Sequence, residues 1–215
     1  MRRLLGSVTV AGLVAGLVMA CGVAPREETQ GNVQRIMYLH VPSVWVAYLA
    51  FAVVLVCSVV YLVRRAEGAD QLAHASAEVG VLFTGITIAT GSIWGRPTWG
   101  TWWTWDARLT TVSILFVMYL GYLLLRGMIE DRERGARFAA VLGIVAAFNI
   151  PLVHFSVIWW RTLHQPPSLM KPGGAAMPDI IRYALFVNFA AFTLLYAYFV
   201  IRRARVLRLE AEADA

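Results

Sequence analysis

The sequence predicts an all-α membrane protein with six transmembrane helices, and three observations lead to this prediction. The chain has 215 residues, 59% of them hydrophobic, and a mean hydropathy of +0.64. Only 15% of its residues are charged, against about 25% in a typical soluble domain. Six stretches each approach the roughly 20 apolar residues that a helix needs to cross a bilayer. We therefore expect a single membrane domain over residues 1–215, with no separate soluble domain.

The first span is expected at about 4–23, directly after Arg2 and Arg3. Its apolar character also resembles a signal peptide, and the residues leading to Cys21 faintly resemble a lipoprotein cleavage site. Met19 is a poor residue for that site, so a retained first helix is the favoured interpretation. In both cases the following loop lies on the outer side of the membrane.

The other five spans follow at about 44–63, 72–93, 109–125, 138–159 and 180–201. Short charged inner loops connect the second span to the third and the fourth to the fifth. A tryptophan-rich outer loop at 94–108 connects the third to the fourth, and Asp106 is expected to cap the first turn of the fourth. Segment 160–178 contains four prolines and two glycines, which predicts an irregular third outer loop.

The distribution of lysine and arginine predicts the orientation of the chain. Of the 19 such residues, twelve lie in segments expected on the inner side and seven on the other side. Because loops rich in these residues stay in the cytoplasm, both termini are expected there. The three outer loops then face the periplasm or its equivalent. We do not interpret the net charge of +6 as a sign of nucleic-acid binding.

The segment WGRPTWGTWWTWDARLTT at 94–111 is the most unusual part of the sequence. Tryptophan rings favour the membrane interface or a flat apolar ligand. The glycines and the proline of this segment predict a bent, partly non-helical backbone that presents an aromatic platform at the edge of the bilayer. An interfacial belt that only anchors the helices is the alternative. Five of the eight tryptophans lie within twelve residues: Trp94, Trp99, Trp102, Trp103 and Trp105.

Two histidines lie in the outer loops on either side of this segment, His40 in the first and His164 in the third. Two imidazoles on either side of a flat ligand are the means by which a protein holds haem through two axial ligands. Arginines could pair with the haem propionates. Alone, each histidine would more often cap a helix or bond locally. The candidate propionate partners are Arg35, Arg96, Arg108 and Arg161.

Three further polar residues fall within the spans. His74 lies near an inner helix end and is expected to be structural, and His154 is expected to be a hydrogen-bonded helix residue or an alternative ligand. Glu78 is the one acidic residue well inside a span, where a charge costs about 2.5–3.5 kcal/mol at the bilayer centre. It is expected to reach the interface, to be protonated or to pair.

Three motifs resemble one family of haem-handling membrane proteins: WGRPTWGTWWTWDARLT at 94–110, RIMYLHVPSVW at 35–45 and FSVIWWRTLHQP at 155–166. The family is haem exporter protein C (CcmC) of the multi-subunit cytochrome c maturation system. The resemblance implies that His40 and His164 are axial ligands to the iron of a transient, non-covalent haem b. It also implies a haem-presenting loop formed by Trp94, Trp99, Trp102, Trp103, Trp105 and Asp106.

The resemblance also implies a location in the bacterial inner membrane and a set of partners. These are a periplasmic haem chaperone, an ABC-type ATPase with its permease subunit, and a very small membrane subunit. The chain has no GxxxxGK[ST] phosphate loop, so we expect a transfer subunit and not an enzyme. If exposed histidines hold the haem, acidification should release it near the ordinary imidazole pKa of about 6.5.

Three alternatives remain open from the sequence. A b-type cytochrome that carries electrons needs histidine pairs on facing helices, and on the inner side only His74 is present. The related single-chain cytochrome c haem synthetases share the tryptophan signature, but they are longer and also attach haem. A transporter with an aromatic belt and no haem is the third alternative.

Overall fold

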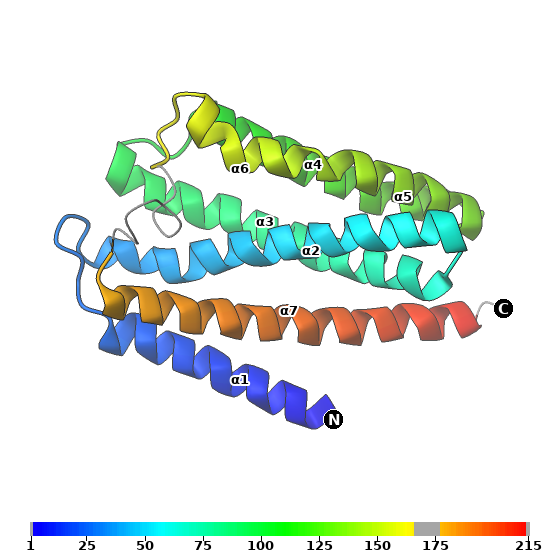
Figure 1. The fold of residues 1–215 in the computed structure, drawn as a ribbon, viewed down its shortest axis with the longest axis horizontal. Coiled ribbons are helices and arrows are strands. Elements are labelled where there is room, and N and C mark those ends of the chain that lie inside the picture. Colours follow the sequence, from blue (N-terminus) through cyan, green and yellow to red (C-terminus); the bar gives the residue numbers. More distant parts are fainter. Residues whose placement is uncertain (1, 166–176, 214–215) are drawn as a thin grey trace.

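The computed structural model describes residues 2–165 and 177–213 as a bundle of long helices lying side by side (Figure 1). Because 166–176 are not described, most of the expected third outer loop lies outside the described residues. The helices are α1 (Arg2–Val18, continued by a π-helical turn at Met19–Val23), α2 (Met37–Arg64, after a 3-10 turn at Asn32–Ile36), α3 (Glu67–Trp99), α4 (Ala107–Met128), α5 (Arg132–Ala147), α6 (Asn149–Trp159) and α7 (Asp179–Ala213).

Six of these helical segments are long and apolar enough to cross a membrane, α5 and α6 together counting as one. Each contains or largely overlaps one of the six spans expected from the sequence. The all-α membrane fold class is therefore confirmed.

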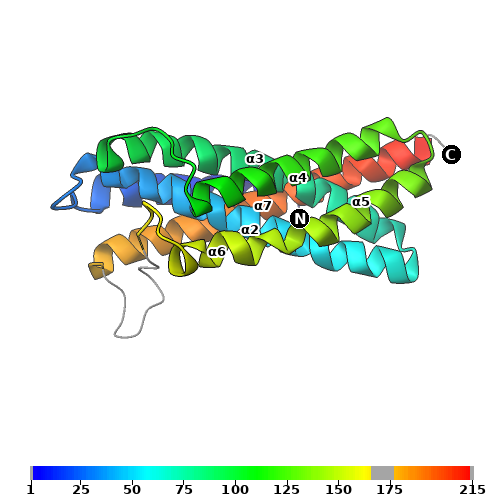
Figure 2. The ribbon, with the colours of Figure 1, turned by 90° about the horizontal axis from the view of Figure 1, so that it is seen from above.

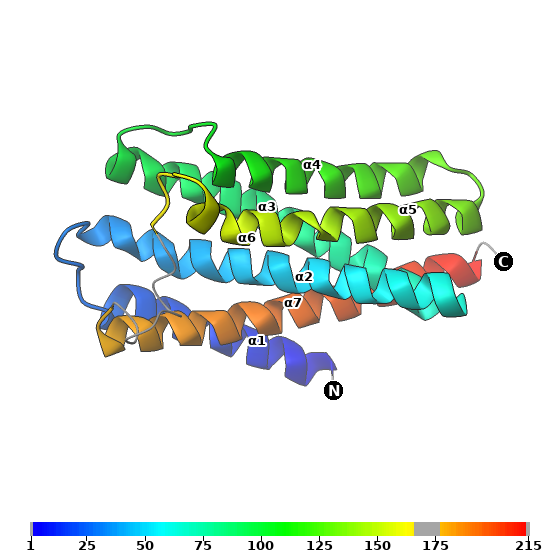
Figure 3. The same cartoon turned by 45° about the horizontal axis from the view of Figure 1, so that its top comes forward.

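The connections divide the bundle into two ends (Figures 1 and 3). At one end lie the α1–α2 and α3–α4 connections, the last turn of α6 and the first turn of α7. We call this the loop end. At the other end lie the α2–α3 and α4–α5 connections and the end of α7, and the view from above shows the same division (Figure 2). Segments far apart in the sequence therefore meet at the loop end.

The centre of the bundle is closely packed between α2, α3 and α4. The ring of Phe51 is stacked on that of Tyr119, with centroids 3.6 Å apart and planes 8° apart. Phe51 also lies against Gly80, where an added Cβ would stand only 2.5 Å from its ring. Helix α3 therefore approaches α2 as closely as a glycine allows.

Helix α1 packs along α7 and belongs to the bundle. Asn188 of α7 donates its Nδ2 hydrogen to the carbonyl of Gly16 at 3.1 Å. Arg35 donates to the carbonyl of Ala20 at 2.7 Å, which satisfies one of the free carbonyls at the end of α1. The structure therefore gives Arg35 a helix-capping contact.

Two helices extend further toward the loop end than the sequence predicted. Helix α2 begins at Met37 and not at 44, and α3 continues to Trp99 and not to 93. Each extension contains a proline, Pro42 or Pro97, and Pro97 was interpreted as a sign of irregular backbone. Each proline removes one i→i−4 hydrogen bond, to the carbonyl of Tyr38 or of Ile93, yet the helix continues on either side of it. Helix α3 ends instead at Gly100, whose positive φ of 82° forms its left-handed cap.

The fifth span is interrupted, which the sequence analysis did not predict. Helices α5 and α6 are separated by a single turn residue, Phe148, close to Pro151. At the break, Asn149 donates to the carbonyl of Thr111 in α4 at 2.8 Å. This contact fixes the start of α6, which leads to the His164 segment.

The opposite end of the bundle carries paired charges. Glu78 accepts from Arg203 at 2.6 Å and lies 3.3 Å from His74, so of the three expectations for Glu78 pairing is correct. Arg126 binds Asp70 through two hydrogen bonds of 2.7 and 2.6 Å. These pairs join α3 to α7 and to α4.

Candidate functional site

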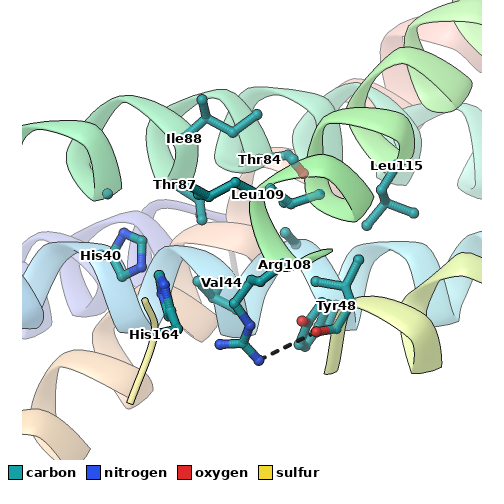
Figure 4. Close-up of a pocket in the computed structure, with 14 residues that line it drawn as sticks. His40, Val44, Tyr48, Thr84, Thr87, Ile88, Arg108, Leu109, Leu115 and His164 are labelled. Carbon is teal, nitrogen blue, oxygen red and sulfur yellow. Dashed lines mark hydrogen bonds between the residues drawn. The ribbon is translucent and has the colours of Figure 1, made fainter. Parts of the chain in front are cut away.

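His40 and His164 face each other at the loop end, with ring centroids 6.5 Å apart (Figure 4). His40 lies in the first turn of α2, so the prediction that it belongs to a loop was wrong. It is only 8% exposed. His164 lies in irregular backbone after α6, as predicted. The structure therefore brings together the two histidines that the sequence analysis paired, one from a helix and one from a loop.

Two cavities meet at this histidine pair. The first has an empty volume of about 570 Å³ and extends between α2, α3 and α4 along Tyr48, Thr87 and Arg108. The second has about 540 Å³ and lies on the side of Trp94, Trp99 and Gln30. Both are lined by His40, Gly91 and His164. The imidazoles thus stand between an inner, mainly apolar space and an outer, aromatic one.

The five tryptophans divide into two groups. The Trp94 ring contacts His40 edge-on, with centroids 5.8 Å apart, and the Trp99 ring lies 4.9 Å from His164. Both belong to α3, so their assignment to a loop was wrong. Trp102, Trp103 and Trp105 follow the helix end and line neither cavity, and Trp105 is 76% exposed. Only the first group touches the histidines.

Of the four candidate propionate partners, Arg35 binds the end of α1, and the other three lie in different surroundings. Arg108 lines the inner cavity, where its Nη2 donates to the carbonyls of Val153 at 3.4 Å (dashed in Figure 4) and His154 at 3.2 Å. Its Nε is buried without a partner in the described part of the chain. Arg96 is exposed and donates to Gly100 at 2.6 Å, and Arg161 is exposed as well. Arg108 alone of the three lies beside the histidines.

Asp106 connects the loop of His164 to α4. Its Oδ1 accepts from the backbone N–H of Leu109 at 2.8 Å, which confirms the predicted helix cap. Its Oδ2 accepts from the N–H of Leu163 at 3.0 Å, one residue before His164. The carboxylate therefore holds the histidine loop and lines neither cavity at the pair.

Burial controls the protonation of His164. Its pKa is lowered to about 4, first because burial disfavours the charged ring and then because Arg108 and His40 lie nearby. Its Nδ1 is enclosed without a hydrogen-bond partner among the described residues. A neutral imidazole with a free nitrogen is the form that binds a metal.

The sequence analysis missed two polar residues of the site. Oγ1 of Thr90 is hydrogen-bonded to Nδ1 of His40 at 3.0 Å. Oε1 of Gln30 accepts from the indole N–H of Trp94 at 2.8 Å. Both contacts join segments more than 45 residues apart, so no local motif signals them. His154 is exposed near Tyr48, with ring centroids 6.3 Å apart, and His74 lies at the other end of the bundle.

Fold and site together define a class: a six-span membrane protein with two facing imidazoles and flanking tryptophans at one end. The model of the family described as Heme exporter protein C matches residues 1–215. The chain belongs to this family.

Three curated relatives carry the same name, Heme exporter protein C. The protein of Bradyrhizobium diazoefficiens is 46% identical over 89% of this chain and 73% of its own length. That of Escherichia coli K12 is 38% identical over 97% of this chain and 84% of its own length. That of Paracoccus denitrificans is 38% identical over 92% of this chain and 80% of its own length.

Proposed function

We propose that this protein binds haem at the loop end and passes it on during cytochrome c maturation. The distance between the two imidazoles is the observation that carries the proposal. Two metal–nitrogen bonds of about 2 Å, plus half an imidazole on each side, separate ring centroids by roughly 6 Å. The observed separation is 6.5 Å. His40 and His164 would be the axial ligands of a non-covalent haem b.

The surroundings of the histidines suit a porphyrin. Apolar and aromatic side chains line both cavities, as a flat apolar ligand requires. Trp94 and Trp99 would contact the haem beside its ligands, and Trp103 with the exposed Trp102 and Trp105 would form the surface from which it is presented. Arg108 would pair with a propionate, because its charge is partly buried and its Nε has no partner in the described residues.

A transfer role agrees with the origin of the two ligands. One ligand is fixed on α2, whereas the other lies on irregular backbone after α6. A site formed in this way can open at the loop without unpacking a helix. The acceptor would be a periplasmic haem chaperone. An ABC-type ATPase, its permease subunit and a very small membrane subunit would complete the complex, with this chain as a transfer subunit and not an enzyme.

The same proposal includes an orientation. The loop end would face the periplasm, and both termini would lie in the cytoplasm of a bacterial inner membrane. The excess of arginine at the opposite end supports this orientation. The sites of a b-type cytochrome would need a second histidine pair near that end, where His74 is engaged with Glu78.

The test is a visible absorption spectrum of the detergent-purified protein loaded with haem. Wild type should give a low-spin haem spectrum, and both His40→Ala and His164→Ala should lose or shift it. His154→Ala and His74→Ala are matched controls that should keep it, because neither ring faces the pair. A wild type that takes up no haem, or a haem band indifferent to both first variants, would refute the proposal.

A further inference from the structure

Helix α3 contacts His40 on one edge of its ring. Thr90 Oγ1 lies 3.0 Å from Nδ1, and both side chains are only 8% exposed. Gly91 comes next: a Cβ added there would stand 3.0 Å from Cε1 and 3.6 Å from Nδ1 of the same ring. The Nδ1 edge therefore rests against α3, and the glycine provides the room for it.

The direction of the hydrogen bond follows from the single proton of a hydroxyl group. Thr90 Oγ1 lies 2.7 Å from the carbonyl of Ile86, one turn earlier in α3, and a carbonyl can only accept. The hydroxyl proton is therefore used on the helix backbone, in the usual contact of a helical threonine. Toward His40 the oxygen can then only accept, so Nδ1 must carry the hydrogen.

This assignment determines the tautomer of His40. A neutral imidazole has one N–H and one free lone pair, so a hydrogen on Nδ1 leaves the lone pair on Nε2. Nε2 has no hydrogen-bond partner in the part of the chain that the structure describes, and the ring lines both cavities. The ligating nitrogen is therefore prepared before any ligand arrives.

We propose that Thr90 is a positioning residue for haem: by accepting the Nδ1 hydrogen of His40, it fixes the ring and directs Nε2 to the iron. The inference rests on the proposed haem site and adds a specific residue to it. Metal-bound histidines generally donate their second N–H to a fixed acceptor, which orients the ring and raises the basicity of the ligand. His164 has no such acceptor, since neither of its ring nitrogens is hydrogen-bonded to any of the described residues.

The test compares Thr90→Val, which replaces the hydroxyl by a methyl group of similar size, with Thr90→Ser, which keeps the hydroxyl. Purified proteins are titrated with haemin, and the reduction potential of the bound haem is measured. Thr90→Val should lower haem affinity by about 10- to 100-fold. It should also raise the reduction potential, because a less basic imidazole stabilises ferric iron less. Thr90→Ser should remain close to wild type in both measurements.

Thr9→Val is the matched control, because Thr9 is also buried and bonds one turn back along its helix, to Leu5 at 2.8 Å, away from the histidines. It should change neither measurement. Wild-type affinity and potential in Thr90→Val, or equal losses in Thr90→Val and Thr90→Ser, would overturn the inference. A wild type that binds no haemin would instead refute the proposed haem site.

Discussion

If His164 is a haem ligand as proposed, acid release of haem depends on the protonation of a buried imidazole. An exposed histidine would protonate near pH 6.5, which was the basis of the sequence-derived expectation. Burial lowers the pKa of His164 to about 4. Half of the bound haem should therefore be lost only at about pH 4 or below in a spectrophotometric titration. Loss with a midpoint near 6.5 would contradict His164 as a buried ligand.

The same pKa has a consequence for stability. Because the folded-state value lies below the unfolded value of about 6.5, the unfolded chain binds the proton more tightly. His164 therefore leaves stability unaffected above pH 6.5 and reduces it as the pH falls from 6.5 towards 4.

Residue types alone identified the histidine pair but not the contacts that orient it. His40 and His164 could be paired because the expected topology put both on one side of the membrane, next to the tryptophans. Thr90 could not be found in this way, because its contact with His40 depends on how α2 is aligned with α3. That alignment follows from packing such as Phe51 against Gly80, which no local pattern encodes.

In the segment between α3 and α4, Asp106 joins the start of α4 to the loop of His164, with one carboxylate oxygen bonded to each. Asp106→Asn retains one side-chain oxygen for the cap of α4, but its amide group cannot accept from Leu163. We expect about tenfold weaker haem binding, since a hydrogen bond to a charged group contributes about 1.5 kcal/mol. Haemin titration measures this change, and the unfolding temperature should stay close to wild type.

Two comparisons separate the roles of Asp106. Asp106→Ala loses the Leu163 contact and the helix cap together. Besides weakening haem binding, it should therefore lower the free energy of unfolding by about 1 kcal/mol. Asp131→Asn is the matched control, because Asp131 caps α5 through Glu133 and Arg134, at the end opposite the histidines. Unchanged haem affinity in Asp106→Asn would show that the Leu163 contact does not position His164.

Helix boundaries were the weakest part of the sequence analysis. All six spans were predicted, but α2 and α3 each continue through a proline toward the loop end. Pro97 was interpreted as a sign of bent backbone, yet a single proline removes only one helical hydrogen bond, and α3 continues past it to Trp99. As a result, His40, Trp94 and Trp99 lie on helices, and within the expected loop at 94–108 only residues 100–106 are irregular.

At the scale of the whole bundle, the pair of Asp70 and Arg126 joins α3 to α4 at the end opposite the histidines. Its side chains are 13% and 12% exposed. Asp70→Ala leaves the arginine charge buried and should lower the free energy of unfolding by about 3–5 kcal/mol. Thermal unfolding of the detergent-solubilised protein measures the loss.

The double variant Asp70→Ala/Arg126→Ala should be less destabilised than Asp70→Ala, because no unpaired charge remains. Glu133→Ala breaks the exposed pair with Arg137 and should cost no more than about 1 kcal/mol. Equal losses in Asp70→Ala and Glu133→Ala would mean that the Asp70 pair is effectively solvated.

The two histidines lie on structurally different supports, and this difference would set the order in which they release a shared ligand. His40 lies in the first turn of a 28-residue helix, and α3 supports its ring, whereas His164 lies on irregular backbone that is bonded to Asp106 through Leu163. Moving His40 would disturb two packed helices, whereas moving His164 requires the hydrogen bond of Leu163 to break and the ring to leave Trp99. If the two imidazoles hold haem as proposed, His164 is therefore the ligand that would yield first to an acceptor, while His40 would keep its position between α2 and α3.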